Sequence, residues 1–157
     1  MVSADYIVGL VDGEGCFYIN IFRDKRYPKA RPIVQTHFYL KLVEDELPLL
    51  KKVQQSLGCG AIYLQRDKRD NHRQCYRFEI NSQKDIHQCV LPFFEKHPLR
   101  SSKRKDFETF KKVALIVKEG KHFEDEGLKR IIELKSGMNS HRARRMRENR
   151  SSGGNAK

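Results

Sequence analysis

Apolar side chains in the first half of the chain switch between the spacing of a helix and that of a strand. Ser3 can cap a helix whose predicted buried stripe is Tyr6, Ile7, Leu10 and Val11. Apolar and polar positions then alternate over residues 17–22 and 33–42, which predicts two strands with one core face each. Helical spacing returns over residues 44–57, where Pro48 is tolerated in the first turn.

The second half repeats the strand pair and then becomes helical. Residues 61–67 and 74–81 alternate, with an expected inner face of Ile62, Leu64, Tyr76, Phe78 and Ile80. Helices are predicted over residues 82–94, 103–118 and 124–135, and the last is expected to bury Leu128, Ile131, Ile132 and Leu134. This order predicts an α+β fold in which an antiparallel sheet is backed by helices on one side.

The chain is strongly basic. Its 157 residues include 32 Lys and Arg against 20 Asp and Glu, a formal net charge of +12. This length suits one domain with a substantial core, and 38% apolar residues exclude disorder along most of it. Such a protein is expected to bind nucleic acid, since each Lys or Arg set against a phosphate releases a condensed counterion. A basic, solvated surface without a specific partner is the alternative interpretation.

Both the charge and the apolar pattern change near residue 138. Residues 139–157 contain six Lys and Arg against one Glu, and only three apolar side chains. We therefore expect one domain over residues 1–138 and a basic, disordered tail over residues 139–157. No apolar run approaches the ~18 residues of a membrane span, and a charge comes as early as Asp5, so neither membrane insertion nor secretion is expected. The four cysteines lack metal-site spacing and are interpreted as reduced thiols of an intracellular protein.

The most informative local sequence lies at the end of the first predicted helix. Gly9 and Gly13, four residues apart, leave one helix face without side chains, so a second helix can approach closely. Asp12 and Glu14 follow at the C-terminal end, where a carboxylate is unfavourable unless a cation compensates the helix dipole. Glu14 is the better metal ligand, because its flanking glycines leave room for the ligand and for the Gly13 backbone carbonyl as a further oxygen donor. A helix end followed by a solvated glutamate is the alternative.

This stretch resembles the LAGLIDADG motif of the homing endonucleases, aligned with Ile7-Val8-Gly9-Leu10-Val11-Asp12-Gly13-Glu14-Gly15. Glu14 stands where those proteins place their metal-binding acid. The predicted order of elements is similar to the family's αββαββα core, with its four-stranded antiparallel DNA-binding saddle and a C-terminal helix. Three further segments are similar to family motifs: Leu57-Gly58-Cys59-Gly60, residues 98–107 and residues 127–139.

The resemblance implies a site-specific homing endonuclease that makes a double-strand break in a long pseudo-palindromic DNA site. Phosphodiester hydrolysis would depend on Mg²⁺, with Mn²⁺ as a substitute, and on Glu14 as a catalytic residue. The sequence holds one copy of the motif, and single-motif members of the family are homodimers. Two copies are therefore expected to pack through Ile7, Gly9, Leu10 and Gly13. The resemblance also implies an intracellular location, in an organelle or in the cytoplasm or nucleoid of a prokaryote.

In related proteins a lysine near the start of the last core helix supports the charge that develops during cleavage. Lys103 is our candidate for this catalytic role and Arg104 is the next, although one alignment places the relatives' lysine at Ser102. The relatives also carry a polar residue, often Gln, at the end of the second strand, where this chain has Leu42.

The outward-facing side chains of the four strands are expected to pair with base edges in the major groove, and cations in the loops with phosphates. These DNA-binding candidates are Asn20, Asp24, Lys25, Arg26, Arg31, Gln35, His37, Tyr39, Gln65, Lys68, Arg69, Arg77 and Glu79. For any one of them, an exposed strand position without a base contact is the alternative.

Two other classes of function stay open. One is an RNA-splicing maturase or a DNA-binding regulator that uses the same fold without cleavage. Glu14 favours the enzyme, because a pure binder gains nothing from an acid that faces phosphates. The other is an unrelated basic RNA-binding α+β protein, but the chain lacks the aromatic pair typical of RNP motifs.

Overall fold

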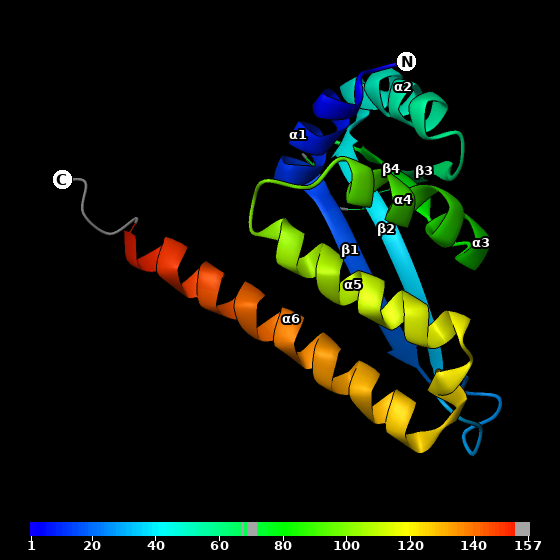
Figure 1. Ribbon diagram of the computed structural model, residues 1–157. Helices are drawn as coiled ribbons and strands as arrows, with labels where there is room; N and C mark the ends of the chain where they lie inside the picture. The colour runs from blue at the N-terminus through cyan, green and yellow to red at the C-terminus, as the bar shows by residue number, and fades with distance from the viewer. Residues whose placement is uncertain (67, 69–71, 153–157) are drawn as a thin grey trace.

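The computed structural model describes residues 1–66, 68 and 72–152, with side chains to residue 138. Figure 1 shows the path of the chain. The elements follow in the order α1 (Ala4–Glu14), β1 (Gly15–Phe22), β2 (Ile33–Val43), η1 (Glu44–Glu46), α2 (Leu47–Leu57), β3 (Ala61–Gln65), β4 (Cys75–Ile80), α3 (Gln83–Asp85), η2 (Ile86–Val90), α4 (Leu91–Lys96), α5 (Lys103–Lys118), η3 (Lys121–Phe123) and α6 (Asp125–Ser152). This order confirms the predicted α+β class.

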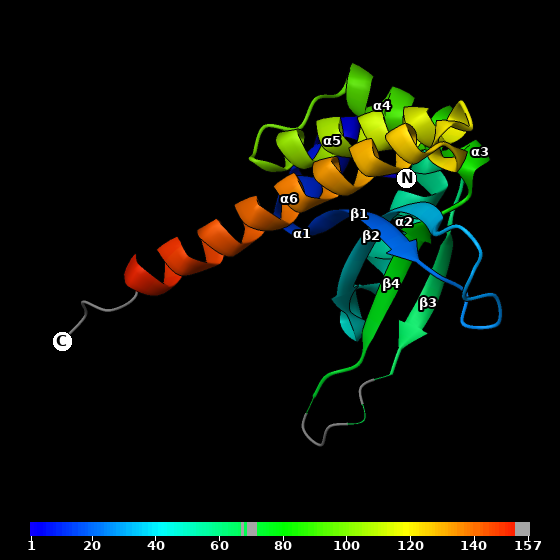
Figure 2. The ribbon, with the colours of Figure 1, turned by 90° about the horizontal axis from the view of Figure 1, so that it is seen from below.

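The four strands form one antiparallel sheet in the order β1-β2-β4-β3. Phe38 of β2 pairs with Phe17 of β1 on one side and with Ile80 of β4 on the other. Helix α5 contacts β1 and β2, and α2 contacts β4. The helices lie on one side of the sheet and leave its opposite side open, as Figures 1 and 2 show. The sheet therefore has one core face and one face available to a ligand, as the alternation predicted.

A cluster of phenylalanines joins the sheet to the helical layer. The ring centroid of Phe17 lies 5.2 Å from that of Phe38 and 5.3 Å from that of Phe110. Phe94 of α4 and Phe107 of α5 complete the cluster at 5.5 and 5.4 Å from Phe17. All five side chains are buried. Burial of α5 through Phe107 and Phe110 confirms the inward face predicted for this helix.

Three side chains predicted to be buried are exposed instead. Tyr6 is 49% exposed, because α1 turns Ile7, Val8 and Val11 toward the core. Leu64 is 41% exposed on β3, an edge strand of the sheet. Ile132 is 46% exposed, since α6 packs through the face that carries Ile131.

Two helical regions differ from their predicted bounds. The segment after Ser82 is helical as expected but contains a π-helical turn, Ile86–Val90, between α3 and α4. Helix α6 was expected to end near Lys135, yet its backbone is helical to Ser152, where it projects away from the other elements (Figure 2). The first fourteen residues of the predicted disordered tail thus continue a helix. A domain boundary at residue 138 stays a prediction.

Thr36 is the one fully buried polar side chain among the described residues. Its hydroxyl accepts a hydrogen bond of 3.0 Å from Nε2 of Gln83, which ties β2 to the start of α3. We expect Thr36→Val to lower the free energy of unfolding by about 1–3 kcal/mol, because it leaves the Gln83 amide without this partner. Urea denaturation measures the change. Thr36→Val combined with Gln83→Leu should recover part of it, and equal losses in the single and double variants would contradict this account.

No helix in the described part of the chain combines the length and the apolar character needed to cross a bilayer. None of the four cysteines forms a disulfide with another described residue. Burial and the neighbouring Cys89 thiol raise the pKa of the Cys59 thiol to about 12. Cys59 is therefore a protonated, weakly nucleophilic side chain at neutral pH.

Candidate functional site

The C-terminal end of α1 presents Glu14 to solvent where the helix passes directly into β1. Ser3 caps the other end, with its hydroxyl accepting a hydrogen bond from the Tyr6 N–H at 3.2 Å. A Cβ atom at Gly15 would lie 2.5 Å from Cγ1 of Val11, so only glycine allows this abrupt change from helix to strand. Glu14 is exposed, and the last turn of α1 carries no basic residue. The end of α1 therefore offers an exposed carboxylate together with the negative end of a helix dipole, with no cation from the helix itself.

Lys103, the first residue of α5, reaches this same helix end. Its Nζ donates a hydrogen bond of 2.8 Å to the carbonyl oxygen of Gly13. Arg104 instead lines an open hollow of about 530 Å³ with Asp5 and Val8, which belong to the first half of α1. The structure thus brings Lys103 to the residue before Glu14 and directs Arg104 to another surface.

Asp12 links α1 to the segment that precedes α5. One carboxylate oxygen accepts hydrogen bonds from the Ser101 N–H at 3.0 Å and the Ser101 hydroxyl at 2.7 Å, and the other accepts one from the Arg100 N–H at 3.0 Å. Burial alone would raise the pKa of Asp12, but these hydrogen bonds and the charge of Lys103 hold that pKa below the ordinary value of 3.8. Sequence reasoning gave Asp12 no role, since nothing local indicates that residues 100 and 101 face it.

The glycine face of α1 is open. Cβ atoms built at Gly9 and Gly13 would meet nothing within 4 Å among the described residues, apart from their own stretch of helix. Tyr6 is exposed on this helix and Leu10 is partly buried. Ile7, in contrast, is only 1% exposed because it packs in the core of its own chain. The assignment of Ile7 to a dimer interface is therefore wrong, whereas Gly9, Leu10 and Gly13 stay candidates.

The chemistry of this helix end suits a cation. No group of three or more His, Cys, Asp and Glu side chains converges on a possible metal position among the described residues. The Lys103 ammonium already places a positive charge against the Gly13 carbonyl. A carbonyl oxygen has two lone pairs, so Gly13 can accept a further cation beside it, and a hard divalent ion prefers such carbonyl and carboxylate oxygens.

The open face of the sheet carries a polar network that spans β2 and β4. Nδ1 of His37 lies 2.5 Å from Oε1 of Glu79. Nε of Arg77 lies 3.1 Å from Oε2 of the same carboxylate, within ion-pair distance, although its N–H makes no hydrogen bond to any described residue. The Arg77 guanidinium stacks over the Tyr39 ring at 3.8 Å, and Oε1 of Gln35 lies 3.3 Å from Nε2 of His37. Five of the sequence candidates for base contacts are thus gathered in one network.

The strand register places further side chains beside this network. Asn20 pairs with Gln35 across β1 and β2, and Gln65 pairs with Cys75 across β3 and β4. Sequence reasoning left out three residues that share the open face: Tyr18, Lys41 and Tyr63. The same alternation that selected His37 and Arg77 could have found them. Leu42 points the other way and packs against the core, so it is not part of this surface.

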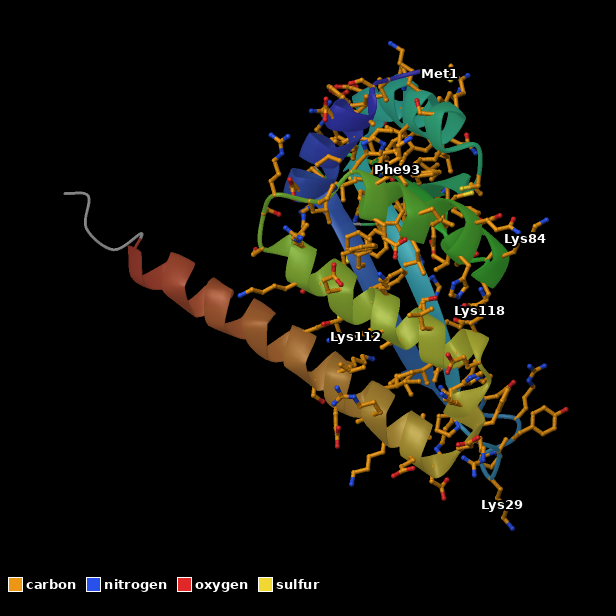
Figure 3. All side chains as sticks on the ribbon, viewed as in Figure 1. Met1, Lys29, Lys84, Phe93, Lys112 and Lys118 are labelled. Atoms are coloured by element: carbon orange, nitrogen blue, oxygen red, sulfur yellow. The ribbon has the colours of Figure 1, made fainter. Side chains whose placement is uncertain are left out.

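The loop candidates differ in how their charges are satisfied. Arg26 forms a two-pronged pair with Asp24, with Nη2 2.7 Å from Oδ2, which lowers the pKa of the Asp24 carboxyl group. Arg31 lies 3.0 Å from Asp125 at the start of α6. Lys25 and Lys68 are exposed, and Arg69 lies outside the described residues. The same loop carries Lys29, whose side chain extends away from the body of the protein in Figure 3.

Comparisons with known proteins agree with this architecture. A family model described as LAGLIDADG endonuclease matches residues 7–114. The chain is 31% identical over 139 residues to "Probable intron-encoded endonuclease 2" of Neurospora crassa, covering 88% of this chain and 29% of that protein. It is 36% identical over 132 residues to "Probable intron-encoded endonuclease 3" of the same organism, covering 83% and 24%. The chain therefore spans less than a third of each of these relatives.

Solved structures extend the similarity to three dimensions. The homing endonuclease I-TnaI is 32% identical with a TM-score of 0.76, and the match covers 94% of this chain and 97% of that one. I-SmaMI, solved bound to uncleaved DNA target in the presence of calcium ions, is 26% identical with a TM-score of 0.77, covering 87% and 45%. The family model and the relatives match the part of the chain that contains the motif and the four-stranded sheet. The chain therefore belongs to the LAGLIDADG endonuclease family.

Proposed function

We propose that this chain acts as a homodimeric, site-specific DNA endonuclease that makes a double-strand break in a long pseudo-palindromic site. The observation that carries the proposal is the contact of the Lys103 ammonium with the carbonyl oxygen of Gly13, the residue before the exposed Glu14, at the end of a helix with an open glycine face. An exposed acid and an amine at the same helix end suit phosphodiester hydrolysis, whereas DNA binding alone gains nothing from an acid that faces phosphates. An intracellular location, organellar or prokaryotic, is part of the proposal.

The proposed homodimer rests on the open glycine face of α1. Gly9 and Gly13 allow a helix to approach at backbone distance, and a second copy of α1 across a two-fold axis is the simplest partner. The chain covers almost all of I-TnaI but 45% of I-SmaMI.

Each copy would contribute Glu14 and the Gly13 carbonyl oxygen to a divalent cation, for which we propose Mg²⁺ with Mn²⁺ as a substitute. When bound, such a cation polarises a phosphodiester and makes a bound water more acidic. Two Glu14 carboxylates brought together would otherwise repel each other, so the dimer itself favours cation binding. Lys103 would hold its ammonium near the scissile phosphate and stabilise the charge that grows during cleavage.

DNA would lie across the open face of the sheet. Arg77 and Gln35 present the guanidinium and amide groups that pair with purine edges, while Lys25, Lys29 and Lys68 suit phosphates. Two such faces would cover about two turns of duplex, roughly 20 base pairs. The net charge of +12 supports binding to this polyanion.

A digestion experiment tests the proposal. The purified chain is incubated with a randomised DNA library in Mg²⁺, in Mn²⁺ and in EDTA, and the ends of cleaved molecules are sequenced. We expect ends that define one pseudo-palindromic sequence, formed only with the metals. Selective binding without cleavage would instead indicate a regulator or a splicing protein.

Lys103→Ala is expected to slow cleavage by about 10²–10³-fold while leaving DNA affinity nearly unchanged, because the ammonium acts mainly in the transition state. Single-turnover cleavage at saturating protein measures the rate, and a binding titration measures affinity. Arg104→Ala is the matched control, since Arg104 lines a different hollow. A loss of affinity and salt dependence at an unchanged rate would make Lys103 a phosphate contact only.

A further inference from the structure

The contacts of Asp12 fix the start of α5 relative to the end of α1. The Asp12 carboxylate accepts hydrogen bonds from Arg100 and Ser101, which lie 88 and 89 residues further along the chain. Both backbone N–H groups belong to the irregular segment between α4 and α5. Without an acceptor from α1, this segment would lose three hydrogen bonds that determine its path.

The same contacts continue to Lys103. The Ser101 hydroxyl donates to Asp12 and accepts a hydrogen bond from the Lys103 N–H at 3.2 Å. The Lys103 ammonium then returns to α1, where it donates to the carbonyl oxygen of Gly13, the residue after Asp12. These hydrogen bonds form a closed ring through Asp12, Ser101, Lys103 and Gly13.

We infer that Asp12 is a positioning residue, which acts through Ser101 to hold the Lys103 ammonium at the end of α1. This inference rests on the proposed endonuclease function. It gives Asp12, the second acid of the motif, a task separate from that of Glu14. Glu14 faces solvent, whereas Asp12 faces the protein.

This ring of hydrogen bonds explains how the Lys103 ammonium can be held at one position despite its long side chain. Lysine has a flexible four-carbon stem, and its ammonium alone does not select one position. Fixing its backbone N–H at one end and its Nζ at the other restricts the stem between two points. Small errors in the placement of a catalytic group cost large factors in rate, so loss of the anchor should reduce the contribution of Lys103.

Asp12→Asn tests this role, because it keeps the size of the side chain but replaces one accepting oxygen with a donor amide. We expect cleavage at saturating protein to slow by about 10- to 100-fold, typical for loss of an orienting partner, while DNA affinity stays at the wild-type level. Asp45→Asn is the matched control at an exposed acid of η1, and it should cleave like the wild type.

A double-mutant cycle separates positioning from a general structural role. In the Lys103→Ala background, Asp12→Asn should cause little further loss of rate, since the group that it positions is already absent. Equal losses in both backgrounds, or an unchanged rate for Asp12→Asn, would overturn the inference while leaving the endonuclease proposal intact.

A spectroscopic measurement decides the inference even if the wild type cleaves no DNA. The ¹H–¹⁵N signal of the Lys103 ammonium, assigned by its absence in Lys103→Ala, should be slow in hydrogen exchange in the wild type and lost in Asp12→Asn. Failure of wild-type cleavage with this signal behaving as expected would remove the endonuclease function but retain the positioning contact. An ammonium signal that is unaffected by Asp12→Asn would remove the positioning role.

Discussion

Glu14→Gln is expected to abolish DNA cleavage and to leave DNA binding unchanged or stronger. The amide keeps the size of the side chain but is a weak ligand for a hard divalent cation, and it removes a negative charge that faces phosphates. Loss of several kcal/mol of transition-state stabilisation corresponds to a rate decrease of at least about 1000-fold.

Single-turnover cleavage and a binding titration with the selected DNA site measure the two effects separately. Glu46→Gln is the matched control, because Glu46 is an exposed glutamate of η1 on another part of the surface. A Glu14→Gln protein that cleaves at the wild-type rate would exclude Glu14 from the active site. Equal loss of binding and cleavage would show instead that the substitution damages the DNA surface.

Gly9→Leu is expected to convert the dimer to a monomer and, with it, to eliminate double-strand cleavage. A Cβ atom at this position meets no described atom outside its own stretch of helix within 4 Å, so we expect the leucine to clash with a second helix rather than with its own chain. Replacement of a helical glycine also improves helix propensity, by about 0.5–1 kcal/mol. The folded monomer should therefore be as stable as the wild-type chain or more stable.

Sedimentation equilibrium measures the oligomeric state, and thermal unfolding at low protein concentration checks the fold. Gly137→Leu is the matched control, because Gly137 also lies in a helix with no atom within 4 Å of a built Cβ, yet on α6. The control should remain dimeric. An unchanged dimer for Gly9→Leu would show that the glycine face of α1 is not the interface.

Helix α1 combines three surfaces within eleven residues. Ile7, Val8 and Val11 enter the core, Gly9 and Gly13 face outward, and the last turn carries the acids. A substitution on any side therefore affects packing, association or chemistry, and the three effects need different measurements. The control substitutions Asp45→Asn and Glu46→Gln on η1 and Gly137→Leu on α6 repeat the same chemical changes at positions away from α1.

The sequence by itself determined the strands and helices whose apolar spacing is regular. In β2, Val34, Phe38 and Leu40 are buried while Gln35 and Lys41 are exposed, because the two-residue period of a strand is a local property of the chain. Helix α5 begins at Lys103 and ends at Lys118 as its 3.6-residue spacing predicted. The choice of Glu14 over Asp12 as the candidate metal ligand also came from local pattern, since glycines flank it.

Only the tertiary structure decided which residues meet. Lys103 and Arg104 are adjacent cations that the sequence ranks first and second for the same role, but the direction in which α5 leaves the preceding segment brings one to Gly13 and the other to Asp5 and Val8. Ile7 fits an interface by spacing, yet the angle of α1 against the sheet buries it. The partners of Asp12 lie 88 and 89 residues away, beyond the reach of any periodicity, because hydrogen bonds between distant segments depend on how the whole chain packs.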